Sequence, residues 1–190
     1  MHFISYEQKL FLKNFIQKPN MVGSILPSSK YLTSSMLKNI DFSSCKSIVE
    51  YGAGTGVFTK EIIGRKNKDT VFISFELNKS LFNQLRSFHA PNQNIYIIND
   101  SVDNIMGHLI GHNIKGIDYI VSGLPFAVLP RDLTLRILDN TLEILRENGE
   151  FVTFQYSLQL FDTLKHFFPQ VSLSYQLFNI PPAFVYHCRK

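Results

Sequence analysis

Three glycines at alternate positions follow a short apolar run near residue 50, in the segment Ser47-Ile-Val-Glu50-Tyr-Gly52-Ala-Gly54-Thr-Gly56-Val-Phe-Thr. Glycine suits a backbone that turns with positive φ, and it lets a ligand approach where a Cβ would stand in the way. A dinucleotide loop, G-x-G-x-x-G, would need glycine at Val57, and a Walker loop would need Gly-Lys-Ser/Thr. The segment has neither pattern. It therefore predicts a ligand-binding turn of another type.

Acidic residues stand beside this loop and after the next two apolar runs. Glu50 precedes the first glycine, Glu76 lies twenty residues beyond the last, and Asp100 follows a third run. In open parallel sheets, ligands bind outside the carboxyl ends of the strands, where an acid can accept hydrogen bonds from ribose hydroxyls. We expect Glu76 in that role and Asp100 beside the adenine amine. One such acid alone is usually a solvated loop end, but the set with the loop favours a cationic nucleoside, S-adenosylmethionine (SAM).

The apolar runs predict the elements that must position these residues. Expected strands cover 47–51, 70–75, 95–98, 118–121 and 150–156, and a closing antiparallel hairpin covers 171–176 and 183–187. Expected helices run from the glycine loop to about Ile63, over 78–88 with Asn78 as N-cap, and over 131–145, closed by Asn148-Gly149. This alternation predicts an α/β fold, a Rossmann-like, mostly parallel seven-stranded sheet with helices on both faces.

Residues 1–40 form a separate element ahead of the expected domain, 41–190. Apolar residues from Phe3 to Ile16 recur at helical spacing with lysines between them, and Pro19-Asn20 ends that helix. Ser28 or Ser29 can cap a second helix that runs through Lys38. Two interpretations stay open: the helices pack on the sheet edge, or they form a lid over the cofactor with a membrane-contacting surface.

Composition restricts the class of protein. The chain has 190 residues, 45% hydrophobic and 18% charged, which suits one globular domain, and its net charge of +4 favours anionic partners. It has no run of apolar residues long enough to span a membrane and no secretory signal pattern, so we expect a cytoplasmic protein, peripheral to the inner membrane face. Cys45 and Cys188 belong to no metal-binding spacing, so reduced thiols and no metal site are expected.

The segment from Glu50 to Gly56 matches motif I, E/D-x-G-x-G-x-G, and the chain from Ser47 onward resembles the class I SAM-dependent methyltransferases. A closer resemblance, to bacterial phospholipid N-methyltransferases related to rRNA adenine dimethyltransferases, spans nearly the whole chain. It implies SAM as cofactor and S-adenosylhomocysteine as product. Three stretches carry it: Phe11-Leu-Lys-Asn-Phe-Ile with Gly23-Ser-Ile-Leu-Pro-Ser-Ser29, Val121-Ser-Gly-Leu-Pro-Phe126, and Asn179-Ile-Pro-Pro-Ala-Phe-Val-Tyr-His-Cys-Arg189. The expected cofactor-binding residues are Glu50, Gly52, Ala53, Gly54, Gly56, Glu76, Leu77, Asp100, Ser101 and Ser122.

The run Ser122-Gly-Leu-Pro-Phe126 ends the fourth expected strand and is the expected acceptor site. Methyl transfer to a neutral amine moves a positive charge, so positioning supplies most of the catalysis. Carbonyls of Gly123 and Leu124 beside Pro125 can accept amine hydrogens, and Phe126 can offer its π-face to the ammonium. In the adenine N6-methyltransferases the corresponding run is Asn-Leu-Pro-Phe/Tyr. Gly123 replaces the asparagine that recognises adenine, and this argues against an RNA substrate.

The amine of phosphatidylethanolamine is an ammonium in water and must lose a proton before attack. Tyr6, Tyr156 and His187 are candidate bases, of which Tyr156 ranks first because it follows the fifth expected strand. Tyr6 and Pro125 are expected to contact the substrate, and Arg189 or the lysines of the first helix could hold a lipid phosphate. The apolar run 126–130 either caps the core or joins Phe3, Phe11 and Phe15 in a mouth for acyl chains.

These residues favour a SAM-dependent N-methyltransferase that acts on phosphatidylethanolamine-type phospholipids at a membrane surface. Three alternatives stay open: an rRNA adenine N6-methyltransferase, an enzyme that methylates a small-molecule or protein amine, and a non-catalytic SAM- or lipid-binding module. The net charge of +4 favours the rRNA enzyme, and Gly123 argues against it. A phospholipid or membrane partner is thus expected before a nucleic acid.

Overall fold

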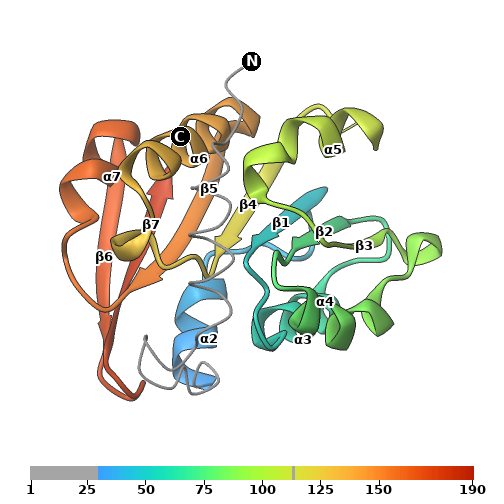
Figure 1. Ribbon diagram of the computed structural model, residues 1–190, viewed down its shortest axis with the longest axis horizontal. Coiled ribbons are helices and arrows are strands. Elements are labelled where there is room, and N and C mark those ends of the chain that lie inside the picture. The colour runs from blue at the N-terminus through green and yellow to red at the C-terminus, as the bar shows by residue number, and fades with distance from the viewer. Residues whose placement is uncertain (1–29, 113) are drawn as a thin grey trace.

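The computed structural model describes residues 30–112 and 114–190, and they form one seven-stranded sheet in the order β3-β2-β1-β4-β5-β7-β6 (Figure 1). The first five strands are parallel, and β7 pairs antiparallel with both β5 and β6. This confirms the expected mostly parallel α/β sheet and its closing hairpin. The strands are β1 Ser47–Tyr51, β2 Val71–Phe75, β3 Ile95–Ile98, β4 Ile117–Ser122, β5 Leu145–Gln155, β6 Gln170–Gln176 and β7 Ala183–Arg189.

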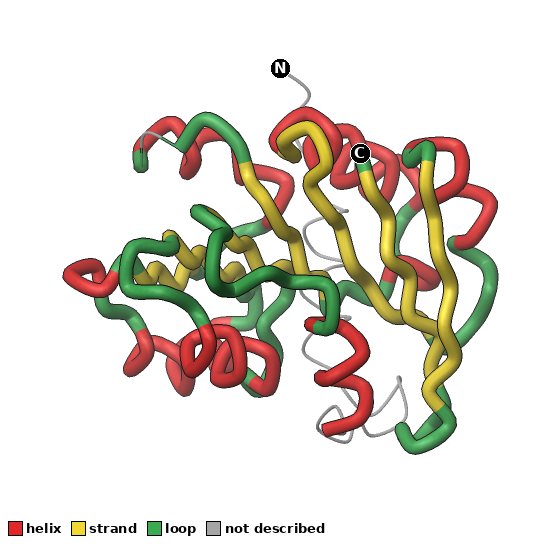
Figure 2. The backbone as a smooth tube through the Cα atoms, turned by 180° about the vertical axis from the view of Figure 1, so that it is seen from behind, coloured by secondary structure: helices red, strands yellow, loops and turns green. Residues whose placement is uncertain are grey.

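Helices cover both faces of the sheet, as Figure 1 and the reverse view in Figure 2 show. On one face lie α2 Lys30–Leu37, α3 Val57–Arg65 and α4 Lys79–Leu85, and on the other lie α5 Ile105–Gly111, α6 Arg131–Ile144 and α7 Phe161–Phe167. Short 3-10 turns at 86–88, 91–93, 102–104 and 126–128 complete the connections. Within the described residues, no helix has the length and apolar character needed to cross a membrane.

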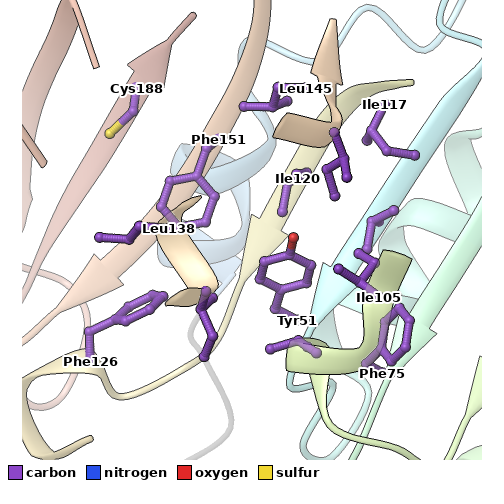
Figure 3. Close-up of a cluster of buried hydrophobic side chains, with 14 of the residues drawn as sticks. Tyr51, Phe75, Ile105, Ile117, Ile120, Phe126, Leu138, Leu145, Phe151 and Cys188 are labelled. Carbon is purple, nitrogen blue, oxygen red and sulfur yellow. The ribbon is translucent and has the colours of Figure 1, made fainter. Parts of the chain in front are cut away.

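The larger core cluster lies under α5, α6 and α7 and includes the side chains labelled in Figure 3. Phe151 stacks on Phe168 with ring centroids 5.7 Å apart and planes 10° from parallel. The Tyr51 hydroxyl lies 3.3 Å from Thr141 Oγ1, so the one polar atom of that buried ring has a partner. This packing fixes β1 and β5 against the helices and so holds the loops that leave their carboxyl ends.

The second core cluster includes α2, where Leu32, Met36 and Leu37 are buried and pack with residues of β1 and β4. The second predicted helix is thus present, and its described part belongs to the core of the sheet. Residues 1–29 lie outside the described residues, so the lid, the membrane-contacting first helix and the division at residue 40 stay predictions. The apolar positions Phe3, Phe11 and Phe15 fall in that segment.

Local signals explain most of the element boundaries. The Asn78 side chain accepts hydrogen bonds from the amides of Ser80 and Leu81, which confirms it as the N-cap of α4. The predicted closure of α6 at Asn148-Gly149 is wrong, because β5 already begins at Leu145 and Asn148, with φ 65°, lies inside an irregular stretch of that strand.

The end of α6 is satisfied by a side chain from the other end of the chain. Lys190 Nζ donates to the carbonyls of Leu142 and Leu145 at 2.6 and 2.8 Å. A glycine cap is not needed once the last carbonyls have this partner. Helices α5 and α7 were not predicted, because each is only seven residues long and α5 contains Gly107 and Gly111.

The register of the sheet brings the carboxyl ends of the parallel strands to one level. Tyr51 pairs with Phe75 on one side and with Ser122 on the other, and Ser122 pairs with Thr153. Phe75 in turn pairs with Ile98 at the end of β3. The residues that follow each strand therefore lie along one edge of the sheet, where the sequence predicts the site.

Candidate functional site

The glycine loop between β1 and α3 is tied to the end of β2. Gly52, Gly54 and Gly56 have φ of 71°, 57° and 81°, and the amides of Gly52 and Ala53 donate to the Phe75 carbonyl at 2.9 and 3.0 Å. A Cβ at Gly54 would meet no heavy atom within 4 Å. The backbone is therefore open to space at the position where a ligand would approach it most closely.

Glu50 lies fully buried at the end of β1, and its two oxygens differ sharply. Oε2 accepts hydrogen bonds from Thr59 Oγ1 at 2.6 Å and from Ser74 Oγ at 2.7 Å. Oε1 has no hydrogen-bond partner among the described residues. Burial raises the pKa of Glu50 to about 7, although the hydrogen bonds from Ser74 and Thr59 act in the opposite direction. A cation bound over the loop would stabilise the charged form of this carboxyl.

Glu76 follows β2 and holds the glycine loop directly. Its Oε2 accepts from the Gly54 amide at 2.7 Å, and its Oε1 accepts from the Asn78 amide at 2.7 Å. Burial raises the pKa of Glu76, while the backbone donors lower it. Each oxygen keeps a further lone pair for a ligand hydroxyl. Leu77, the next residue, is partly exposed at the same edge.

Asp100 lies beyond β3 in a network that the sequence did not reveal. Its Oδ1 accepts from the Ser101 amide and from Asn104, and its Oδ2 lies 2.9 Å from His108 Nε2. Burial raises the pKa of Asp100, but the hydrogen bonds from His108, Asn104 and Ser101 outweigh it and the pKa is lowered. His108 belongs to α5, a helix that was not predicted, so its approach to Asp100 could not be foreseen.

A second missed residue, Asn99, connects the ends of β2 and β3. Its side-chain amide donates to the carbonyls of Glu76 and Leu77 at 2.8 and 3.2 Å. The expected cofactor residues on β1, β2 and β3 are therefore brought together at one edge. Among the partners, only Asn99 carried a signal in the sequence, because it stands directly before Asp100.

The acceptor run leaves β4 beside the glycine loop. The Gly123 amide donates to the Tyr51 carbonyl at 2.8 Å, and the buried Ser122 hydroxyl accepts from the Leu124 amide at 3.2 Å. Gln155, the buried last residue of β5, donates from Nε2 to the Leu124 carbonyl at 2.9 Å and accepts from the Ala127 amide at 3.3 Å. Gln155 was missed as a positioning residue, although a polar residue at a buried strand end was a usable signal.

These hydrogen bonds correct the roles expected of the carbonyls. The Leu124 carbonyl accepts from Gln155 and from the Phe126 amide, and the Pro125 carbonyl accepts from the Val128 amide. Among the described residues, no donor is bonded to the Gly123 carbonyl. Within the part of the chain that the structure describes, the Gly123 carbonyl thus differs from those of Leu124 and Pro125 in having no donor.

Phe126 does not lie as expected. Its ring is 3% exposed, forms a T-shaped contact with Phe151 at 6.2 Å, and lies among the core side chains in Figure 3. Its π-face is therefore not open to an ammonium in this conformation. Phe126 and Leu129 thus belong to the core, whereas Ala127 and Val128 are exposed, and the expected contact of the run 126–130 with Phe3, Phe11 and Phe15 lies outside the described residues.

The other acceptor-site candidates fall in different places. Tyr156 follows β5 at the site edge and is partly exposed, and burial raises its pKa although a hydrogen bond with Asn179 lowers it. The role of Tyr156 as a base stays a prediction. Arg189 lies level with Glu150, away from the strand ends, whereas His187 lies level with Val152, next to Thr153, and is buried against Glu150 at 2.6 Å. Tyr6 lies outside the described residues.

A close backbone approach joins the glycine loop to the acceptor run. A Cβ at Gly123 would lie 2.8 Å from the Gly52 carbonyl oxygen, a distance that side chains essentially never adopt. The acceptor run therefore lies closer to the glycine loop than any residue but glycine permits. An asparagine here, as in the adenine enzymes, would require the backbone to move.

We expect Gly123→Ala to destabilise the protein by about 1 to 3 kcal/mol and to weaken SAM binding, because it forces the two loops apart. Gly107→Ala is the control, since a Cβ there meets nothing within 4 Å. Urea denaturation and titration calorimetry measure both effects. Equal stability and SAM affinity in the two variants would contradict the tight contact.

Glu50 predicts a specific pH dependence of stability. The pKa of this carboxyl is raised from 4.5 to about 7, so the unfolded chain loses the proton first as pH rises. Stability is therefore lost between these two values and not regained above them, by about 3 kcal/mol in total. Glu50→Gln should remove this part of the pH dependence, as unfolding free energies from pH 4 to 8 will show. Parallel profiles for the two proteins would be the opposite result.

Comparison with known proteins places this geometry in a class. No protein-family model matches the chain. The ornithine lipid N-methyltransferase of Singulisphaera acidiphila is 29% identical over 181 residues, which cover 95% of this chain and 94% of that protein.

Among solved structures, a Burkholderia thailandensis 1,6-didemethyltoxoflavin-N1-methyltransferase with bound S-adenosylhomocysteine has a TM-score of 0.70 at 11% identity, covering 100% of this chain and 92% of that one. Precorrin-6y C5,15-methyltransferase from Geobacter metallireducens has a TM-score of 0.63 at 13% identity, covering 84% of this chain and 88% of that one. An rRNA methylase from Streptococcus thermophilus has a TM-score of 0.59 at 17% identity, covering 83% of this chain and 93% of that one.

The structural neighbours share the fold, and the curated relative shares sequence along nearly the whole chain. The sheet order, the motif I loop and the acids at successive strand ends agree with both. These likenesses support the class I SAM-dependent methyltransferase that motif I predicts.

Proposed function

We propose that this enzyme methylates the amine nitrogen of a polar amino lipid, phosphatidylethanolamine or an ornithine lipid, at a membrane surface. The observation that carries the proposal is the 29% identity with an ornithine lipid N-methyltransferase across 95% of the chain. The contact between Gly123 and the Gly52 carbonyl supports it, because it leaves no room for the asparagine that adenine methyltransferases use. The same contact argues against RNA methylation.

The residues at the strand ends fit SAM. Gly54 leaves space above the loop, Glu76 offers two oxygens to the ribose hydroxyls, and Asp100 can accept a hydrogen bond from the adenine amine. The unpartnered oxygen of Glu50 places negative potential under a cationic ligand. When bound, SAM supplies a methyl group whose bond to sulfur breaks as its bond to nitrogen forms, which leaves the neutral thioether S-adenosylhomocysteine.

The acceptor half positions the amine. The Gly123 carbonyl accepts one amine hydrogen and directs the nitrogen lone pair toward the cofactor side of the site. Gln155 keeps the run rigid through Leu124 and Ala127. The substrate arrives as an ammonium and must lose its proton before attack, and Tyr156, His187 and Tyr6, which lies outside the described residues, stay the candidate bases. Tyr156 lines the rim of the site.

The tip of the β6–β7 hairpin supports the proposal that the enzyme acts at a membrane surface. Leu177, Phe178 and Ile180 are 65%, 72% and 73% exposed, and the exposed ring of Tyr31 lies 5.1 Å from that of Phe178. The tip extends beyond the carboxyl end of β5, the site edge, as Figure 1 shows. Large apolar side chains gathered at one exposed tip are typical of a surface that enters a bilayer interface.

The proposal is tested by offering labelled SAM together with vesicles that contain phosphatidylethanolamine, vesicles that contain an ornithine lipid, and bulk RNA. We expect label in an amino lipid, with N-methyl products identified by mass spectrometry. Glu76→Ala should lose the label because the ribose acceptor is gone and the glycine loop loses the partner of its Gly54 amide. Label in RNA alone would overturn the lipid substrate. SAM binding without labelled product would favour a non-catalytic module.

Replacing Leu177 and Phe178 together by Asp should reduce sedimentation with vesicles at least tenfold, since each buried apolar side chain contributes roughly 1.5 to 3 kcal/mol. Methylation of a soluble short-chain lipid should persist in this double variant. Ile110→Asp is the matched control, because Ile110 is 77% exposed on α5, outside the hairpin. If the double variant sediments as the control does, the hairpin is not the membrane contact.

A further inference from the structure

A cavity of about 290 Å³ adjoins the acceptor run. Phe126 and Ala127 form one wall, the first turn of α6 forms another through Arg131 and Thr134, and Gln159 precedes α7 on a third. The loops that form it leave the carboxyl ends of β4 and β5, the strands that pair through Ser122 and Thr153. The cavity therefore lies at the same sheet edge as the Gly123 carbonyl.

Arg131 supplies an uncommitted positive charge to this cavity. Its side chain is exposed, and none of the ion pairs formed by the described residues includes it. Arg136, on the same helix, is instead paired with Asp103 at 3.4 Å. Asp132 is next to Arg131 and exposed, but it does not line the cavity. A guanidinium with free donors is the protein group best suited to carboxylate or phosphate.

Thr134 gives an independent sign of a missing ligand. Its side chain is 7% exposed, it lines the cavity, and its hydroxyl has no hydrogen-bond partner among the described residues. Buried hydroxyls are normally bonded, and a threonine in a helix usually reaches a carbonyl of the preceding turn. In this conformation the hydroxyl oxygen is closed to the cavity, so a ligand oxygen would become its acceptor only after the side chain turns to another rotamer.

The start of α6 adds to the same field. The helix is fourteen residues long, and its N-cap, Pro130, has no side chain that accepts from the first-turn amides. Unbonded amides and the helix dipole favour a negative charge at this end. The Gln159 amide and the Thr163 hydroxyl, which also line the cavity, provide further donors.

We propose that this cavity binds the anionic group of the amino-lipid substrate while its amine reaches the Gly123 carbonyl. The inference rests on the proposed function. The shared chemistry is an oxyanion a few bonds from an amine, which is a phosphate in phosphatidylethanolamine and a carboxylate in ornithine. Arg131 and Thr134 are the specificity-determining residues, because they select zwitterionic lipids over simple amines.

The test compares a short-chain phosphatidylethanolamine and a short-chain ornithine lipid with an alkylamine of matched length that has no anionic group. Arg131→Gln should raise the KM for both zwitterionic substrates about tenfold, with little change in kcat and no change for the alkylamine. Arg131→Lys should recover part of the loss. Arg86→Gln is the control, an exposed arginine outside the cavity and the described ion pairs with the same change in net charge. Equal KM values for Arg131→Gln and Arg86→Gln would overturn the assignment.

Thr134→Val separates a ligand from a structural role. Removing a buried, unpartnered hydroxyl should leave the free protein as stable or more stable, while the KM for zwitterionic lipids rises. A higher stability with unchanged KM would overturn the role of Thr134.

Calorimetry distinguishes a failure of the anion site from a failure of the proposed function. If the wild type methylates no amino lipid, calorimetry with glycerophosphoethanolamine and with inorganic phosphate still decides the cavity. Heat that is present in the wild type and lost in Arg131→Gln supports the anion site, and heat with phosphate alone assigns it to free phosphate. Absent heat, or equal heat in both proteins, overturns it.

Discussion

The site depends on one backbone contact, the approach of Gly123 to the carboxyl end of β1. The Gly123 amide donates to the Tyr51 carbonyl at 2.8 Å, and its Cα faces the Gly52 carbonyl so closely that a Cβ would lie 2.8 Å from the oxygen. This contact joins the loop expected to hold the cofactor to the run proposed to hold the acceptor. Because methyl transfer needs both reactants in line and close together, the distance between the loops is itself a catalytic quantity. Glycine at this position therefore has a positive role beyond the loss of an adenine-reading side chain.

Buried carboxyls then stiffen the cofactor half. Glu76 uses both oxygens on backbone amides, so the group expected to face the ribose also holds the glycine loop in its open shape. Glu50 is satisfied on one side only, and its pKa of about 7 shows how costly its charge is without a ligand. A cation would offset that cost, so part of the binding free energy is stored in the folded protein as an unfavourable burial. The acid that begins motif I thus acts through the electric field that it creates.

Strong local patterns made the fold predictable, and long-range partners limited the prediction of the site. The apolar runs at 47–51 and 95–98 give the bounds of β1 and β3, and the glycine spacing located the loop. The Asn148-Gly149 prediction failed because Lys190, at the far end of the chain, satisfies the helix end instead. Gln155 and His108 were missed for the same reason, since each acts on a residue from another element. Arg189 was expected beside the substrate, but the antiparallel course of β7 carries it away from the strand ends.

The charges along this edge are arranged in an order that matches the reactants. Acids lie at the ends of β1, β2 and β3, on the expected cofactor side, and Arg131, which forms no ion pair with the described residues, begins the helix after β4. Gly123, which carries no charge, lies between these two groups. Under the proposed function, a cationic cofactor and an anionic headgroup are drawn to opposite halves, which places the amine at the junction between them. The strand order 3-2-1-4-5 imposes this sequence of charges, because it sets β1 directly against β4. We infer that the residues at the ends of the adjacent strands β1 and β4 determine the substrate class.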